Sequence, residues 1–152
     1  MRSGMFILLS LLPLGLVVGC GGGGGEDQWT KDRPKVVPVS GTVTYHGEVV
    51  EGADVVFRSA GHQSPAYAQT DAEGRFELTT FDQGDGAVPG SHQVRISKIV
   101  VEQPEIKDPE GIIPPTKEEN HLPAKYNDFE KSQLTATVKE DGENDFKFEL
   151  TD

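Results

Sequence analysis

The sequence predicts an all-β domain, a sandwich of seven antiparallel strands, and three observations indicate that fold class. Apolar and polar residues alternate with a period of two in several short stretches, as half-buried strands require. Turn-forming residues separate most of these stretches, and the 152 residues include 18 Gly and 10 Pro, which disfavours a helical bundle. No long stretch has the apolar spacing of an amphipathic helix. Strands that are apolar on one face are expected where two sheets share a core.

Seven stretches of the chain carry the alternating pattern. In order they cover 39–45, 53–58, 67–70, 75–79, 92–97, 134–139 and 146–150. Turns are predicted at 46–47, 71–74 and 141–144, because Asp can accept hydrogen bonds from its own turn and Gly can adopt a positive φ. Gly41, inside the first stretch, indicates a crowded or bulged strand position.

Residues 99–133 break the alternation. Pro104, Pro109, Pro114, Pro115 and Pro123 lie in this segment, which is therefore predicted to be a long Pro-rich loop. Four of its residues are candidates for fixing the loop to the sandwich, namely Ile112, Ile113, Leu122 and Tyr126.

The first residues have the composition of a secretory leader, predicted to be cleaved. Arg2 gives a positive start, 5–18 is almost wholly apolar, and small residues precede Cys20. About fourteen apolar residues are too few for a permanent transmembrane helix, which needs about twenty. An ordinary secreted protein and an uncleaved anchor with a chance cysteine are the alternatives. Five glycines at 21–25 then predict a flexible tether.

The residues at the end of the leader resemble a bacterial lipoprotein signal, with Val17-Val18-Gly19-Cys20 as the lipobox. The resemblance implies a signal peptide over 1–19 and a membrane anchor at Cys20, acylated by fatty acids such as palmitate on its sulfur and new N-terminus. Several acyl chains anchor stably where one binds only marginally. Position 21 is Gly rather than the Asp that favours inner-membrane retention. An extracytoplasmic lipoprotein of the outer membrane, facing the periplasm or the surface, is therefore favoured.

Residues 36–152, which follow the lipidated cysteine and linker (20–35), resemble the carboxypeptidase regulatory-like domain. Four runs carry the resemblance: VSGTV at 39–43, GADVVF at 52–57, TDAEGRF at 70–76 and VPGSHQV at 88–94. LPAKY at 122–126, followed by LTATV at 134–138, is similar to small bacterial lipoproteins built on that domain. The resemblance implies a transthyretin-like (prealbumin-like) Greek-key sandwich.

Charge and cysteine content exclude several classes of partner and site. The chain has 25 acidic and 14 basic residues and a formal charge of −11, so a nucleic acid or an anionic lipid surface would be repelled. A single cysteine excludes an intrachain disulfide and a thiolate metal cluster.

No catalytic constellation is recognisable in the sequence. A Gly-x-Ser-x-Gly motif is absent, and the four histidines, His46, His62, His92 and His121, do not have zinc-ligand spacing. His92 falls on an apolar strand face, which favours a packed, hydrogen-bonded histidine. The transthyretin-like fold includes a hydrolase of 5-hydroxyisourate that ends in Tyr-Arg-Gly-Ser, whereas this chain ends in Glu149-Leu150-Thr151-Asp152. A noncatalytic protein is expected.

Calcium is the one cofactor that the sequence leaves open. Asp82 and Asp85 lie in a tight acidic turn, but the spacing from Asp82 does not fit an EF-hand loop. An irregular Ca²⁺ site at these residues, or at the acidic turn that contains Asp141, Glu143 and Asp145, is one hypothesis, and solvated turn carboxylates are the alternative.

Exposed aromatic rings on a sandwich can stack on sugars, and the candidates are Tyr45, Tyr67, Phe81 and Tyr126. Tyr45 is in phase with apolar Val43, which indicates a core position. Tyr126, beside the long loop, is the candidate ligand-binding residue, and a ring that covers the edge of the sandwich is the alternative.

Taken together, these features predict a lipid-anchored extracytoplasmic β-sandwich that acts as a structural or protein-interaction module of the cell envelope. Its partners would be the membrane, through Cys20, and an envelope protein or polysaccharide. A carbohydrate- or envelope-polymer-binding module and a Ca²⁺-dependent adhesion domain are the alternative functions.

Overall fold

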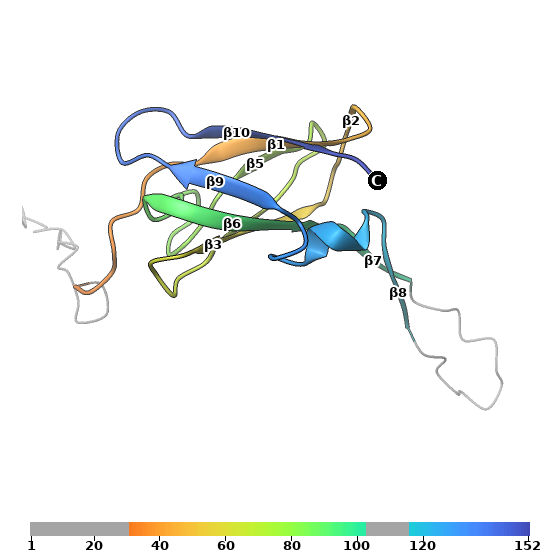
Figure 1. Cartoon of the computed structure of the whole chain (residues 1–152), viewed down its shortest axis with the longest axis horizontal. Helices are drawn as coiled ribbons and strands as arrows, with labels where there is room; N and C mark the ends of the chain where they lie inside the picture. Colours follow the sequence, from red (N-terminus) through yellow and green to blue (C-terminus); the bar gives the residue numbers. More distant parts are fainter. Residues whose placement is uncertain (1–30, 103–115) are drawn as a thin grey trace, which may run out of the picture. The chain divides into compact units, whose positions relative to one another are not determined.

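The computed structural model describes residues 31–102 and 116–152 (Figure 1). The chain divides into two units, 1–33 and 34–152. The leader, Cys20, the glycine tether, Ile112 and Ile113 lie outside the described residues. Within them, the second unit contains ten strands and a single turn of 3-10 helix, η1 (Ala124–Asn127).

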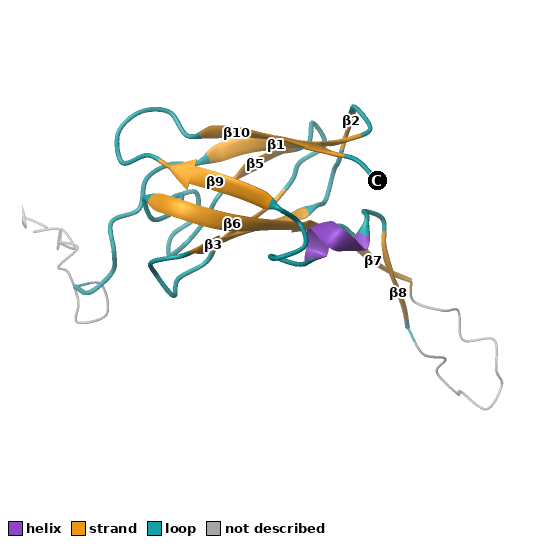
Figure 2. Cartoon of the chain, viewed as in Figure 1, coloured by secondary structure: helices purple, strands orange, loops and turns teal. Residues whose placement is uncertain are grey.

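The strands form an all-β architecture of several sheets (Figure 2). In one sheet, β1 (Ser40–Tyr45) lies between β10 (Asp145–Leu150) and two short partners, β2 (Glu48–Val49) and β5 (Arg75–Glu77). The second sheet has the order β4 (Ala66–Gln69), β3 (Asp54–Ser59), β6 (Gly90–Ser97), β9 (Leu134–Val138). The all-β prediction is confirmed, and each of the seven predicted stretches contains a strand.

One strand pairing differs from the antiparallel prediction. β1 and β10 are parallel, in register from Ser40 opposite Asp145 to Tyr45 opposite Leu150. The turn after β9 carries the chain from one sheet to the other, so β10 does not fold back on β9 as a hairpin. It comes to lie beside β1 and runs in the same direction. Alternation within a strand reveals which face is buried and says nothing about strand direction, which is why this pair was missed.

The predicted Pro-rich loop at 99–133 is also more regular than expected. Its described parts contain η1 and an antiparallel pair, β7 (Ile99–Glu102) with β8 (Lys117–Asn120). The β-branched residues at 99–101 favour a strand. β8 has the sequence KEEN, which lacks the apolar alternation from which a strand could have been predicted. Ile99 and Val101 are 45% and 52% exposed, so β7 gains little from burial.

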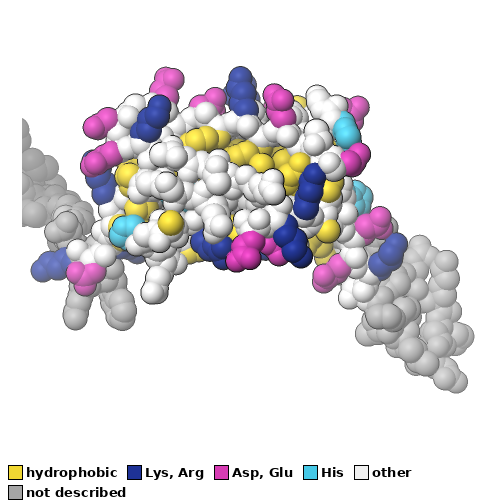
Figure 3. All heavy atoms as spheres, in the orientation of Figure 1, with side chains coloured by type: hydrophobic (Ala, Val, Ile, Leu, Met, Phe, Trp, Pro, Cys, Tyr) yellow, Lys and Arg dark blue, Asp and Glu magenta, His cyan; other side chains and the backbone are white. Residues whose placement is uncertain are grey.

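The core lies between the two larger sheets and is centred on Phe57 of β3. Phe57 is fully buried, and its ring centroid is 5.8 Å from Phe146, 6.0 Å from Phe148 and 6.3 Å from Phe76. Aliphatic side chains at the inward positions of β1, β3, β6 and β10 complete it: Val43, Val55, Val94, Ile96 and Leu150. Figure 3 shows apolar side chains between the sheets on one face, with charged side chains along the borders.

Gly41 meets the expectation of a crowded strand position. A Cβ built there would overlap the carbonyl oxygen of Phe146 and lie 2.6 Å from the Phe76 ring. The absence of a side chain on β1 therefore makes room for the aromatic core.

Candidate functional site

The outer face of the second sheet (β4-β3-β6-β9) carries a distinctive group of side chains, which includes two arginines. Along β3, Val55 and Phe57 point into the core, so Val56 and Arg58 point outward. Along β6, Val94 and Ile96 are buried, so Gln93 and Arg95 point outward. Arg58 is directly opposite Gln93, and Arg95 is opposite Val56. The two arginines are therefore diagonal neighbours, about 7–8 Å apart at the backbone.

Both arginines contact one aromatic ring that comes from outside the sheet. The Arg58 guanidinium carbon lies 4.2 Å from the Phe129 ring centroid, and that of Arg95 lies 5.5 Å from it. Arg58 Nη2 donates to Gln93 Oε1 at 2.6 Å, and Arg95 Nη1 donates to Asn127 Oδ1 at 3.2 Å. We call these five residues, Arg58, Gln93, Arg95, Asn127 and Phe129, the arginine face.

The segment after η1 holds Phe129 in place. Asp128 Oδ1 accepts hydrogen bonds from the backbone N–H groups of Glu130 (2.9 Å) and Lys131 (3.1 Å). These bonds, first that of Lys131, lower the pKa of the Asp128 carboxyl. Ser132 Oγ donates to the carbonyl of Val94 at 2.6 Å and so ties the segment to β6. Phe129 thus lies on a turn that its neighbours fix, rather than on a free loop.

Neither guanidinium makes a salt bridge in the described part of the chain, although the carboxylates of Asp128 and Glu130 line the same hollow and the charge of Arg58 helps to lower the pKa of Asp128. Among the residues in the described ranges, neither Arg58 nor Arg95 has a carboxylate oxygen within 4.0 Å. In addition, Arg95 Nε is buried and has no hydrogen-bond acceptor in that part of the chain. Among the described residues, the two adjacent arginines thus make no charge-assisted bond to a carboxylate, which is the strongest kind of hydrogen bond that arginine makes. The face is therefore equipped to receive an external anionic group.

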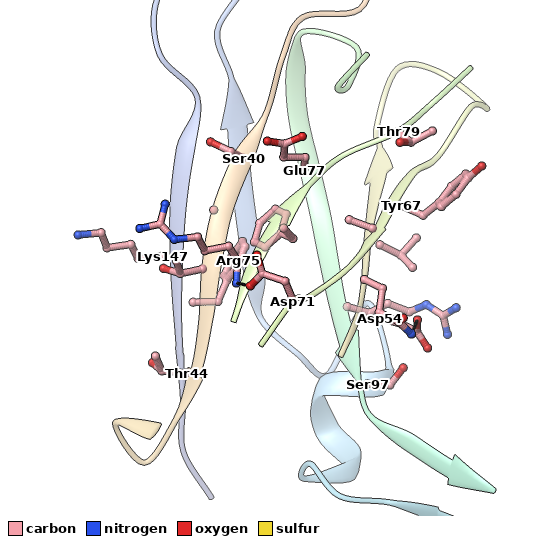
Figure 4. Close-up of a pocket in the computed structure, with 18 of the residues that line it drawn as sticks. Ser40, Thr44, Asp54, Tyr67, Asp71, Arg75, Glu77, Thr79, Ser97 and Lys147 are labelled. Carbon is pink, nitrogen blue, oxygen red and sulfur yellow. Dashed lines mark hydrogen bonds between the residues drawn. The ribbon is translucent and has the colours of Figure 1, made fainter. Parts of the chain in front are cut away.

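The surface around these residues is shallow and open. A hollow of about 380 Å³ is lined by Arg58, Arg95, Asn127, Asp128, Phe129 and Glu130. It adjoins a broader hollow of about 1540 Å³, since Arg95 and Asn127 line both. In the broader one, Arg75 and Lys147 project from one sheet while Tyr67 and Asp54 project from the other, in the opposite direction (Figure 4). Those polar side chains do not converge on one chamber.

Tyr126, the candidate ligand-binding residue, is not available for stacking. Only 6% of it is exposed, and its hydroxyl donates to the carbonyl of Thr151 at 2.9 Å and accepts from the Thr151 N–H at 3.0 Å. Burial alone would raise the pKa of Tyr126, but these bonds and the nearby Lys125 lower it overall. The ring belongs to the core cluster, and its hydroxyl bonds both backbone groups of Thr151, just after β10.

The other aromatic candidates occupy different surroundings. Tyr45 is partly buried against the core, and its hydroxyl donates to Asp152 Oδ1 at 2.5 Å. This bond raises the pKa of Tyr45 and lowers that of Asp152. Phe81 is half-buried. Tyr67 is 56% exposed and lies opposite Val56, on the same outward row as Arg95, so it is the candidate that adjoins the arginine face.

Asp85 caps its own turn. Its Oδ1 accepts the N–H of Thr80 at 2.7 Å, and its Oδ2 accepts those of Phe81 (3.0 Å) and Asp82 (2.9 Å). Desolvation alone would raise the pKa of Asp85, but the three backbone bonds outweigh it and lower the pKa. Asp82 is exposed in the same turn. Within the described ranges, no three His, Cys, Asp or Glu residues gather as metal ligands.

His92 lies in the core, as its position on an apolar strand face predicts. It is 3% exposed, its Nε2 is 2.7 Å from the carbonyl oxygen of Val88, and its ring centroid lies 5.7 Å from that of Phe57, with the two rings tilted by 49°. Nδ1 is buried without a partner among the described residues. Desolvation lowers the pKa of His92, so the ring is neutral at pH 7.

The lipidation prediction at Cys20 falls outside the described residues. In 31–102 and 116–152, no helix has the length and apolar character needed to cross a bilayer.

Comparisons with known proteins assign no family to this chain. No protein-family model matches it, and no curated protein matches it. Among solved structures, a 9R-lipoxygenase from Cyanothece PCC8801 matches with 15% identity and a TM-score of 0.38. That match covers 80% of this chain and 17% of the lipoxygenase chain. A likeness this distant carries no argument about fold or activity.

The arginine face was not anticipated from the sequence. Arg58 and Arg95 occupy ordinary outward strand positions, and Phe129 lies in the segment expected to be a loop. One signal was available in the sequence: both arginines occupy positions on the polar faces of predicted strands, and the chain is otherwise strongly acidic. Their convergence on one ring depends on the pairing of β3 with β6 and on the turn after η1, which no local pattern specifies.

Proposed function

We propose that this chain is a lipid-anchored, noncatalytic binding module of the cell envelope, and that the arginine face is its contact surface. The observation that carries the binding role is the pair of guanidiniums, which contact one ring and make no salt bridge within 4.0 Å among the described residues. A rigid patch of arginine and aromatic side chains is the composition typical of binding hot spots.

The anchor belongs to the same proposal. The leader, the lone cysteine at its end and the five glycines that follow support attachment through acylated Cys20. The proposed location is extracytoplasmic, at the outer membrane, where a glycine tether would let the domain reach its partner. The negative charge of the chain supports a partner other than a nucleic acid.

The carboxypeptidase regulatory-like assignment, with its transthyretin-like Greek-key sandwich, is part of the proposal too. Setting aside β2 and the β7–β8 pair leaves seven strands, three in one sheet and four in the other. This number and division support the assignment. Folds of this kind serve many functions, so the functional argument depends on the arginine face and not on the fold.

The experiment is crosslinking in intact cells. A benzophenone amino acid at Thr135, exposed on β9 opposite Gln93, reports on the arginine face, and the same group at Lys147, on β10, reports on the other sheet. Benzophenone inserts into C–H bonds of proteins and glycans alike. We expect capture from Thr135 and much less from Lys147. Equal capture, or none from Thr135, would refute the binding surface.

A labelled fatty acid tests the anchor separately. We expect incorporation into the wild-type chain and recovery in the membrane fraction, and loss of both in Cys20→Ser. A wild-type chain that takes up no label would refute the lipid anchor and leave the binding surface standing.

A further inference from the structure

We infer that the arginine face binds a sparsely charged acidic glycan, through a carboxylate on one of its sugars. The inference rests on the proposed binding function and adds the chemical class of the ligand.

The carboxylate follows from the donors that remain free. Each guanidinium has five N–H groups, arranged as a planar fork that matches the two oxygens of a carboxylate. Arg58 uses Nη2 on Gln93, and Arg95 uses Nη1 on Asn127. The Arg95 Nε is buried, so the donors open to a ligand are the remaining N–H groups of Arg58 and the Nη2 group of Arg95. Phe129 contacts both guanidiniums beside the hollow that they line. The side chains are ordered before a ligand arrives, which lowers the entropic cost of binding.

A peptide carboxylate fits this position poorly. Extended peptides commonly bind by adding a strand at a free sheet edge. Arg58 and Arg95 lie on β3 and β6, and both strands already pair on each side. The hollow is also wide and shallow, without the apolar groove that would take a helix. A peptide would contact this face through side chains alone.

A glycan fits the remaining side chains. Amide groups of Gln93 and Asn127 flank the arginines, and the exposed Tyr67 lies two strands from Arg95 on the same row, about 9–10 Å away. Amides can bond hydroxyl groups, and an aromatic ring offers an apolar face with a polar tip. One sugar can therefore place its carboxylate on the arginines while a neighbouring sugar lies over Tyr67.

The charge of the whole chain limits how acidic that glycan can be. A formal charge of −11 repels a dense polyanion. At physiological salt the screening length is about 8 Å, so an isolated carboxylate experiences mainly the charges that line the hollow, which are the two arginines and the carboxylates of Asp128 and Glu130. A polymer with one carboxylate per repeat is favoured over one with a carboxylate on every sugar.

Isothermal titration calorimetry in 0.15 M NaCl tests the inference. The probes are a hyaluronan hexasaccharide (one uronate per disaccharide), its carboxyl-reduced form, an oligogalacturonate (one uronate per sugar) and a polyglutamate peptide. The variants are Arg58→Gln, Arg58→Lys, which keeps the charge without the fork, and Arg75→Gln. The last is the matched control, because Arg75 is an exposed arginine on β5 of the other sheet.

We expect the hyaluronan hexasaccharide to bind the wild-type chain more tightly than the oligogalacturonate, and at least tenfold more tightly than the reduced form. Arg58→Gln and Arg58→Lys should each weaken binding about tenfold, Arg75→Gln should leave it unchanged, and melting curves should show every variant folded.

No binding of either uronate glycan, equal binding of the reduced form, or equal loss in Arg75→Gln would overturn the inference. Polyglutamate binding as tightly as hyaluronan, with the same dependence on Arg58, would overturn the glycan class and leave the proposed function intact. Failure of crosslinking from Thr135 would instead refute the proposed function itself.

Discussion

The seven-strand body and the segment between β6 and β9 are built by different means. In the body, inward side chains are almost completely buried, and Phe57 contacts three other phenylalanines. In the segment, Ile99 and Val101 are about half exposed, and order comes from individual hydrogen bonds such as Ser132 to Val94. The body gives the chain its stability, and the segment supplies Phe129, which turns two ordinary strand arginines into a surface for recognition.

Truncating one phenylalanine in each region gives the largest contrast. Phe57→Ala removes a fully buried ring and should lower the free energy of unfolding by about 3–5 kcal/mol. Phe129→Ala removes a half-buried ring and two cation–π contacts, each worth about 0.5–1 kcal/mol, and should cost much less. Urea unfolding measures both free energies. Equal losses would mean that the segment is part of the main core.

The crowding at Gly41 gives the next largest effect. In Gly41→Ala, the new methyl group would overlap the Phe146 carbonyl and the Phe76 ring, so we expect a loss of about 1–3 kcal/mol. Gly61→Ala is the matched control, because nothing lies within 4 Å of the position of its Cβ. Thermal melting of the two variants makes the comparison. A Gly41→Ala chain as stable as Gly61→Ala would show that β5 and β10, the neighbours of β1 in its own sheet, can make room for the methyl group without cost.

The difference between the regions also explains what the sequence could predict. Alternation at Val43, Val55 and Val94 identifies the inward face of each strand directly, because burial on one face imposes a period of two. It identifies neither the direction of β10 nor the strand β8, whose KEEN sequence has no apolar alternation. Phe129 was missed for the same reason, since its position depends on Asp128 and Ser132 and not on a repeating pattern.

Acid should destabilise the body through His92. Its pKa is lowered in the folded state, because charging the ring would cost desolvation, whereas the unfolded chain has the ordinary value near 6.5. Above that pH neither state is protonated and stability is unaffected. As the pH falls from about 6.5 towards the folded pKa, the unfolded state binds more protons, and stability falls by at most about 1.4 kcal/mol per pH unit.

Urea unfolding at pH 7.5 and at pH 5.5 checks this linkage. His92→Phe, which keeps an aromatic ring in the core, should reduce the difference between the two values, and His121→Gln, at an exposed position of the segment, should leave it unchanged. If the His92→Phe chain showed the wild-type difference, another group would be responsible for the acid sensitivity.

The smallest effect is expected where the segment meets the body. Tyr126→Phe removes the hydroxyl that bonds both backbone groups of Thr151, and should cost about 1 kcal/mol. Because those bonds join η1 to the end of β10, amide exchange should quicken at Asp128 and Ser132, whose N–H groups bond Lys125 and Asp128. Amides of β3 and β6 should keep their protection.

Tyr45→Phe, which loses an exposed bond to Asp152, is the control. Faster exchange in β3 as well would show that the segment and the body open as one unit, against the distinction drawn between them.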